Sequence, residues 1–345
     1  MKSKNIALVI NNAFEYAGTE NICNFMSDCL GEKNRVTIYS LQGEGEPFYK
    51  FEKVTSIINF KNHKRPMLSL LKTLKSHNPD IVFVISMGKL SVVFKIMSWI
   101  MLLKFNDVSC EHVSITSYPI HIKVLKIFFL RFYNKVVVLT DRDRKFLSKW
   151  KVNATRIFNP IKNNQFTRNC FNNKFLAVGR LETQKGFERL LYNWSLFKRS
   201  DYNSKLTIVG SGSLEEALKQ LALKYKIQQS VTFLGKINDM ESIYKEHDVF
   251  LMTSLYEGLP MVLLEAKSWA MPVVAYDCPT GPKEIISNNV DGYLIKDSDS
   301  EAFVDKMKSF SVDKNLYLQF SRNTVSTSKK FSMESIKNEW IMLIN

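Results

Sequence analysis

Residues 254–286 read SLYEGLPMVLLEAKSWAMPVVAYDCPTGPKEII and contain a turn, a helix and a strand in close succession. Gly258 suits a tight turn, and Pro260 suits the first turn of a helix, where its missing N–H is not needed. The helix that follows is apolar on nearly all sides, so we expect it to be buried. The run Val273–Ala275 predicts a strand directly after it. This order is typical of α/β proteins with a parallel sheet.

Two glutamates in this stretch are candidates for ligand binding. Glu265 lies inside the expected buried helix, where a carboxylate needs a hydrogen-bond partner, either a ligand hydroxyl or a structural group in the core. Glu257 lies just before the helix N-terminus, where free N–H groups favour an anion such as phosphate. The pair could therefore hold opposite ends of one ligand.

The rest of the chain alternates in the same way, with helical patterns between short apolar runs. The expected strands are Ile6–Ile10, Val36–Tyr39, Ile81–Ile85, Val108–Cys110, Val136–Leu139, Phe175–Val178, Leu206–Val209, Val231–Leu234, Val249–Met252 and Val273–Ala275. Asn159–Pro160 and the polar stretch after it interrupt this rhythm, and 345 residues suit two domains at about 150 residues each. We expect an N-terminal domain at 1–163, a C-terminal domain at 164–330, and a last helix at 331–345. Both domains are expected to be Rossmann-like and doubly wound, with ligands at the carboxyl ends of the strands.

Composition excludes several classes of protein. Hydrophobic residues make up 45% of the chain and charged residues 23%, so a disordered chain is excluded. The longest apolar stretch, 92–103, is interrupted by Lys95 and is too short to span a membrane. The first apolar run, Ile6–Ile10, reaches Asn11 after five residues, which favours a strand over a signal peptide. Five cysteines without a C-x-x-C pair indicate a reducing compartment and no zinc site. A cytoplasmic protein is therefore expected.

The net charge of +15 is unevenly distributed along the chain. Residues 1–160 hold 24 Lys and Arg against 12 Asp and Glu, whereas residues 161–345 hold 24 against 21. The basic half indicates an anionic partner, such as nucleic acid, a membrane surface or a phosphorylated substrate. A solvated basic surface without a partner is the alternative.

Three short motifs have weaker interpretations. Gly210-Ser-Gly212 follows an expected strand, but the third glycine of a dinucleotide fingerprint is missing, which argues against a Rossmann oxidoreductase. Asp141-Arg-Asp143 and Asp297-Ser-Asp299 have the D-x-D spacing of a metal site. Both stand at expected helix starts, where an aspartate caps free N–H groups, so we interpret both as caps.

Residues 257–265, EGLPMVLLE, match the E-x7-E motif of the family-four retaining glycosyltransferases of the GT-B fold. Four other segments of the second half resemble this family: 178–191, 209–222, 233–254 and 277–295. The first half resembles it less strongly, at 16–30 and 111–114. The resemblance implies two Rossmann-like domains facing across a cleft, with the last helix returning to the first domain.

The resemblance also implies roles for individual residues. Arg180 and Lys185 would hold the donor diphosphate and stabilise the leaving group. Glu257 would contact the donor sugar and Glu265 the ribose. The turn Gly258–Pro260 and the N–H groups of Leu259, Met261 and Val262 would meet phosphate or sugar, and Gly235, Lys236 and Ile237 would flank the nucleobase.

Two first-domain residues are implied in the same way. His112 would lie beside the donor sugar, although an ordinary loop or core histidine is the alternative. Gly18 would allow close approach of the backbone to diphosphate or acceptor. The family commonly has two glycines here, whereas this chain has Ala17–Gly18.

The resemblance implies sugar transfer with retention of configuration at the anomeric carbon. The family's usual mechanism is front-face departure, in which the leaving phosphate helps to deprotonate the incoming hydroxyl. No metal and no cofactor are expected besides the nucleotide-sugar co-substrate, because the cations of Arg180 and Lys185 replace a metal.

The acceptor side is inferred from two basic amphipathic segments, 119–135 and 61–75. Lys123, Lys126 and Arg131 in the first segment could lie near anionic headgroups, and core helices with snorkelling lysines are the alternative. A peripheral contact with the inner face of the membrane suits a saccharide acceptor carried on a polyprenyl diphosphate.

We therefore expect a transferase that moves a hexose or N-acetylhexosamine from a UDP-linked sugar in bacterial O-antigen, capsule or exopolysaccharide synthesis. A nucleotide-sugar epimerase of the same fold and a non-catalytic sugar- or nucleic-acid-binding module are the alternatives. The absence of interleaved aromatic RNA motifs argues against nucleic acid as a partner.

Overall fold

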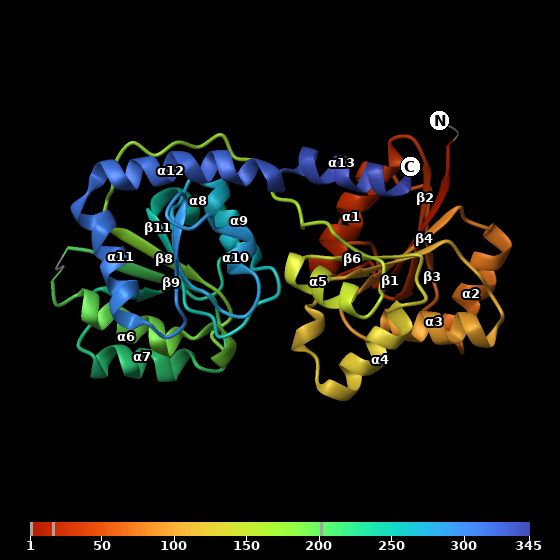
Figure 1. Ribbon diagram of the computed structural model, residues 1–345, viewed down its shortest axis with the longest axis horizontal. Coiled ribbons are helices and arrows are strands. Elements are labelled where there is room, and N and C mark those ends of the chain that lie inside the picture. The colour runs from red at the N-terminus through yellow and green to blue at the C-terminus, as the bar shows by residue number, and fades with distance from the viewer. Residues whose placement is uncertain (1–2, 16–17, 201–202) are drawn as a thin grey trace. The chain divides into compact units, whose positions relative to one another are not determined.

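The structure, a computed structural model, describes residues 3–15, 18–200 and 203–345 and contains two compact units. Unit 1 comprises Met1–Asn159 and Glu334–Asn345, and unit 2 comprises Pro160–Met333. Each unit is built on one parallel β-sheet with helices on both faces (Figure 1). The α/β architecture with two parallel sheets, expected from the sequence, is confirmed.

The sheet of unit 1 has seven strands in the order β3-β2-β1-β4-β5-β6-β7. Their bounds are β1 Asn5–Asn12, β2 Arg35–Gln42, β3 Ser56–Asn59, β4 Ile81–Ser86, β5 Asp107–Glu111, β6 Lys135–Val138 and β7 Ala154–Arg156. The strand order reverses between β1 and β4, which pair directly, with Ile6 opposite Ile81 and Ile10 opposite Ile85. At such a reversal the connecting loops diverge to opposite faces, so the carboxyl edge at β1 and β4 can form a pocket.

Helices cover both faces of this sheet (Figure 1). Their bounds are α1 Gly18–Gly31, α2 Pro66–His77, α3 Leu90–Ile100, α4 Ile120–Leu130, α5 Asp141–Lys149 and α13 Met333–Ile344. Helices α2, α3 and α4 share one core with the sheet, while Trp340 of α13 packs on Phe83 of β4 with ring centroids 5.8 Å apart. Lys337 of α13 also pairs with Glu32 at 2.6 Å, so the last helix of the chain is part of unit 1, as expected.

The segment 61–75 does not present an apolar face to solvent. Leu70, Leu71 and Leu74 of α2 are buried in the core of unit 1, because the apolar side of this amphipathic helix packs on the sheet. These three leucines are therefore not available for the expected membrane contact at 61–75, which otherwise stays a prediction.

The sheet of unit 2 has six strands in the order β10-β9-β8-β11-β12-β13. The strands are β8 Lys174–Val178, β9 Lys205–Val209, β10 Val231–Phe233, β11 Val249–Met252, β12 Val273–Tyr276 and β13 Gly292–Ile295. The helices are α6 Phe187–Phe197, α7 Glu215–Lys224, α8 Met240–Glu246, α9 Met261–Ser268, α10 Pro282–Ile285, α11 Ser300–Val312 and α12 Lys314–Ser328. Helices α6, α7 and α11 lie on one face, and α9 and α12 lie together on the other (Figure 1).

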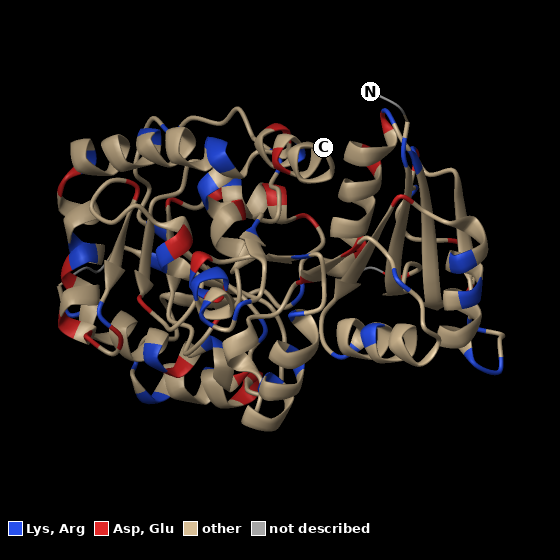
Figure 2. Ribbon diagram, turned by 45° about the vertical axis from the view of Figure 1, so that its right-hand side comes forward, with Lys and Arg blue, Asp and Glu red and all other residues tan. Residues whose placement is uncertain are grey.

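Charged residues lie over the surfaces of both units (Figure 2). No helix of the described residues is long and apolar enough to cross a bilayer.

Candidate functional site

Lys185 and Glu257 meet at the carboxyl edge of the unit 2 sheet. Lys185 ends a short 3-10 turn, Thr183–Lys185, between β8 and α6, and Glu257 lies in the loop between β11 and α9. The Lys185 Nζ lies 2.7 Å from Glu257 Oε1, and the two side chains are only 16% and 7% exposed. Ser254 Oγ donates to the same carboxylate oxygen at 2.6 Å. Two residues predicted to act on one ligand are thus brought into direct contact, in an ion pair that the sequence did not indicate.

The two glycines beside Lys185 lie in close contact with their surroundings, and at Gly186 the backbone requires a glycine. A Cβ on Gly179 would lie 3.2 Å from the Lys185 stem, so the lysine lies directly across this position. Gly186 has φ of +63°, and a Cβ there would lie 2.2 Å from the carbonyl oxygen of Thr253. The G-R-x4-K-G spacing therefore fits the β8–α6 loop against the β11–α9 loop.

Arg180 lies exposed on the rim of the same site and is linked to it through Gln184. Its Nη2 donates to Gln184 Oε1 at 3.3 Å, and Gln184 Nε2 donates to the carbonyl of Tyr256 at 3.0 Å. The main-chain N–H of Leu255 donates to the carbonyl of Gln184 at 2.8 Å. The two loops that carry Arg180 and Glu257 are therefore joined by hydrogen bonds.

Arg189, which the sequence analysis did not identify, holds the end of β11 in place. It donates to the carbonyls of Thr253 and Ser254, both at 2.6 Å, and pairs with Asp297 at 2.8 Å. Its guanidinium also lies 4.6 Å from the ring centroid of Tyr276. A cation in the apolar helix pattern of 187–197 was the only local signal for this role.

The segment 277–286 packs against the turn after Glu257. Thr280 Oγ1 donates to the main-chain carbonyl of Glu257. Gly281 has φ of +94°, and a Cβ there would lie 2.5 Å from Pro260 Cδ and 2.7 Å from the carbonyl oxygen of Gly258. Pro260 is the N-cap of α9 instead of a first-turn residue, since Leu263 N donates to its carbonyl at 3.1 Å.

Glu265 has a structural partner, one of the two possibilities left open by the sequence. Tyr244 of α8 donates its hydroxyl to Glu265 Oε2 at 2.7 Å. Burial raises the pKa of Glu265 above its ordinary value, and the Tyr244 hydroxyl opposes that shift. Met261 and Val262 are half-buried in the first turn of α9, with Leu259 buried just before it.

The loop after β10 completes this edge of unit 2. Gly235 has φ of +67° and accepts a hydrogen bond from Gly210 N at 2.8 Å, with Lys236 exposed and Ile237 half-buried beside it. A Cβ on Gly210 would lie 1.9 Å from the carbonyl oxygen of Gly179. The glycine at 210 is therefore explained by contact between loops, without a dinucleotide fingerprint.

Unit 1 has a pocket of its own at the carboxyl edge of its sheet, with a volume of about 1260 Å³. It is lined by the ends of β1, β2 and β4 and by the start of α3. Its polar lining includes Asn11, Asn12, Glu15, Thr19, Glu20, Gln42, Glu44, Lys61 and Lys89. Gly18, the first residue of α1, is exposed and is not among the lining residues. Ala17, which was expected to alter this loop, lies outside the described residues.

His112 follows β5 and is not among the residues that line the pocket. Both its ring nitrogens are shielded from solvent. Burial lowers the pKa of His112 to about 4, opposed by the side chain of Asn159, so the ring is neutral at neutral pH.

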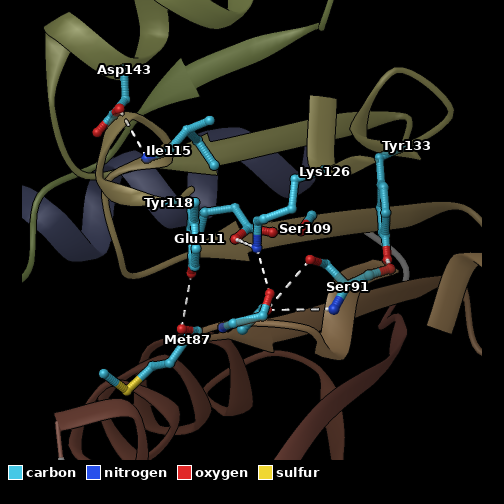
Figure 3. Close-up of polar contacts among 11 residues, drawn as sticks. Met87, Ser91, Ser109, Glu111, Ile115, Tyr118, Lys126, Tyr133 and Asp143 are labelled. Carbon is cyan, nitrogen blue, oxygen red and sulfur yellow. Dashed lines mark hydrogen bonds and ion pairs between the residues drawn. The ribbon is translucent and has the colours of Figure 1, made fainter. Parts of the chain in front are cut away.

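Beside His112, Glu111 belongs to a buried network that sequence reasoning missed (Figure 3). Lys126 of α4 lies 2.7 Å from Glu111 Oε2 and donates to the carbonyl of Gly88 at 2.5 Å. Ser109 Oγ donates to the other oxygen of Glu111 at 2.8 Å, and Tyr118 donates its hydroxyl to the carbonyl of Met87 at 3.0 Å. The network thereby fixes residues 87–88, which line the pocket.

The placement of Lys126 corrects one prediction. Its side chain is 1% exposed and paired, so it does not point toward a membrane surface.

Neither D-x-D motif is a simple pair of caps. Asp299 does cap α11, accepting from Ala302 N at 3.0 Å, but Asp297 pairs with Arg189. At the other motif Thr140 is the cap of α5, and Asp143 accepts from the Ser114 hydroxyl. Among the described residues, no group of three or more His, Cys, Asp and Glu side chains could hold a metal ion.

Comparison with known proteins points in one direction. The family model described as Glycosyl transferases group 1 matches residues 161–326. The chain is 33% identical over 353 residues to the amylovoran biosynthesis glycosyltransferase AmsD of Erwinia amylovora, covering 99% of each chain. It is 27% identical to a Campylobacter jejuni α-1,4-N-acetyl-D-galactosaminyltransferase, covering 95% of this chain and 94% of that one. The crystal structure of Anabaena HepE in complex with UDP aligns with a TM-score of 0.80 and 16% identity over 99% of both chains.

Proposed function

Since this chain belongs to the group 1 glycosyltransferases, we propose that it transfers a hexose or N-acetylhexosamine from a UDP-linked sugar to a saccharide acceptor. The reaction would serve the assembly of a bacterial surface polysaccharide. The name of the Erwinia relative, an amylovoran biosynthesis enzyme, supports this assignment, and the UDP complex of HepE supports the choice of nucleotide.

The contact between Lys185 and Glu257 is the observation that carries the proposal. It places a cation and a carboxylate together at the carboxyl edge of a parallel sheet, where α/β proteins bind ligands. The diphosphate of the donor would take the Lys185 ammonium as a partner, with Arg180 on the rim as a second cation. The hydrogen bonds from Lys185 and Ser254 to the Glu257 carboxylate are both accepted by Oε1, so we expect Oε2 to accept from a hydroxyl of the donor sugar.

In this proposal Arg180 and Lys185 stabilise the leaving group. They would stabilise the negative charge that develops on the diphosphate as the bond to the anomeric carbon breaks. The anomeric configuration would be retained, with the departing phosphate oxygen assisting removal of the proton from the acceptor hydroxyl. His112 would remain neutral and could act only through hydrogen bonds, because its pKa is about 4.

We assign the acceptor to the pocket of unit 1. Its amide, carboxylate and lysine side chains suit the hydroxyl groups of a saccharide and the charge of a phosphate. The Campylobacter relative is named for an acceptor linked to PP-undecaprenol, which supports a lipid-carried acceptor at the cytoplasmic face of the membrane.

A thermal-shift panel of UDP, GDP, ADP and their common sugars, without added metal, tests the donor assignment. A nucleotide present at about 100 times its dissociation constant stabilises the folded state by roughly 2.7 kcal/mol. We expect stabilisation by UDP and UDP-sugars alone, followed by UDP release when a matching acceptor is added. A folded protein that responds to none of the nucleotides would contradict the proposal.

A further inference from the structure

Helices α3 and α4 and the residues that directly follow each of them expose several large apolar side chains on unit 1. The set, called here the α3–α4 surface, comprises Ile100, Leu102, Ile120, Val124, Phe128 and Phe132. Ile100 is 68% exposed and Leu102 is 90% exposed. Apolar side chains that gather in this way on one face mark an interaction site more often than a plain solvated surface.

Aromatic contacts hold the middle of this surface in shape. The ring of Trp99 lies 4.5 Å from Phe132 and 5.5 Å from Phe129, centroid to centroid, and Phe128 lies 5.4 Å from Phe132. These contacts join the end of α3 to the end of α4, so the surface exists before any partner arrives. A partner would therefore bind without first ordering these side chains.

The charge around the α3–α4 surface has one sign. Between residues 81 and 140 the only acidic residues are Asp107 and Glu111, and both are buried in ion pairs, with Lys95 and Lys126. The other charged residues of this segment are all basic: Lys89, Lys104, Lys123, Arg131 and Lys135. These five basic residues, called here the basic border, and the exposed apolar side chains of the same segment together complement an anionic lipid surface, in which apolar side chains enter the headgroup region and cations meet phosphates.

The pocket of unit 1 adjoins the start of α3. Met87 and Val93 both line the pocket, and both are exposed at the start of α3. Tyr118, which precedes α4, donates to the carbonyl of Met87, and Lys126 of α4 donates to the carbonyl of Gly88, so both bonds reach the loop before α3 (Figure 3). Two exposed apolar residues at the start of α3 therefore also belong to the wall of the pocket.

We propose that the α3–α4 surface rests on an anionic bilayer and that this contact brings the mouth of the pocket to the level of the headgroups. A lipid-carried acceptor could then keep its lipid in the bilayer while its polar end enters the pocket, an inference that rests on the proposed function. A second copy of the chain is a poorer partner, because a symmetric contact would place this basic border against itself.

Co-sedimentation of the full chain with vesicles tests the proposal. We expect binding to vesicles of phosphatidylcholine with phosphatidylglycerol, weaker binding to phosphatidylcholine alone, and a decrease with added salt. Ile100→Ser/Phe128→Ser should weaken binding at least about tenfold, because it removes two apolar contacts. Lys104→Gln/Arg131→Gln should weaken binding about fivefold for each cation.

Leu223→Ser/Val312→Ser is the matched control, since both leucine and valine are exposed apolar residues of unit 2. It should bind vesicles as the unchanged chain does. The proposal is overturned if the unchanged chain does not bind anionic vesicles, or if the Ile100/Phe128 variant binds equally well. A dimer that the Ile100/Phe128 variant dissociates would also overturn it, since a second copy would then cover the surface.

Activity without lipid separates this proposal from the proposed function. UDP release with a soluble acceptor fragment should be the same in the Ile100/Phe128 variant and the unchanged chain, because neither residue lines the pocket. Vesicle binding without any UDP release would contradict the proposed function and support the membrane contact. UDP release by the unchanged chain without any vesicle binding would support the proposed function and overturn the membrane contact.

Discussion

Lys185 and Glu257 neutralise each other in the free protein, and each is mostly buried. A lysine in such a position is already desolvated and fixed, so a diphosphate that reaches it gains a preorganised charge-assisted hydrogen bond. The same contact, with the hydrogen bond from Ser254, orients the Glu257 carboxylate. The two residues therefore form one ion pair, and removal of either leaves the other without this partner.

Lys185→Ala should lower the rate of sugar transfer at least about tenfold, the size of one lost charge-assisted contact in the transition state. The measurement is UDP release at saturating donor. Lys219→Ala is the control, because Lys219 makes only an exposed pair with Glu215 on α7, 2.8 Å apart. Unchanged turnover in a folded Lys185→Ala protein would show that Lys185 does not contribute to sugar transfer.

Tyr244→Phe should destabilise the protein by about 1–3 kcal/mol at neutral pH, because the buried carboxylate of Glu265 loses its donor. Burial already raises the pKa of Glu265, so the folded state binds more protons than the unfolded state, and this group's contribution to stability falls as pH rises through that raised pKa. Without the hydroxyl, the pKa rises further. The deficit should therefore be larger near about pH 8 than near about pH 5.

Urea unfolding at the two pH values measures this difference. Tyr192→Phe is the control, because the Tyr192 side chain is exposed on α6. A deficit that is independent of pH would mean that the Tyr244 hydroxyl does not act on the Glu265 carboxylate.

The buried pair of Glu111 and Lys126 joins β5 to α4 and, through the carbonyl of Gly88, to the loop before α3. Lys126→Met should destabilise the protein by about 3–5 kcal/mol, since it leaves a buried carboxylate without its cation. Lys123→Met on the same helix should change stability by less than about 0.5 kcal/mol. Glu111→Gln/Lys126→Met should recover much of the loss, and an additive double variant would show that the pair is not coupled.

The elements that sequence reasoning missed share a physical cause. Strands β3, β7 and β13 are short and lie at sheet edges or beside them, so they need little of the apolar pattern that marks a central strand such as Ile81–Ser86. The site of unit 2 was recognisable because its residues fall in short motifs with fixed glycines. Arg189 and Lys126 were not recognisable as partners, since Asp297 and Glu111 lie in other elements and no local period records such contacts.

The C-terminal residues 334–345 bind the first unit, although the chain reaches them through the second. Trp340 is buried, packs on Phe83 of the central strand β4, and shares its helix with Ile336, which is also buried. The stability of unit 1 therefore depends on the end of the chain, whereas Arg180, Lys185 and Glu257 lie in unit 2. A destabilising substitution in α13 should therefore lower the stability of unit 1 and leave the stability of unit 2 unchanged.

Trp340→Ala should destabilise unit 1 by about 3–5 kcal/mol, the usual cost of truncating a buried tryptophan. Nucleotide binding should persist, because Lys185, Glu257 and Arg180 belong to unit 2. In denaturant unfolding of Trp340→Ala, unit 1 should unfold at a lower denaturant concentration than in the unchanged chain. The transition of unit 2 should remain, and UDP should still move it to a higher denaturant concentration. Met342→Ala on the exposed side of the same helix should unfold as the unchanged chain does. A Trp340→Ala protein that loses UDP binding together with unit 1 would show that the two units fold as one.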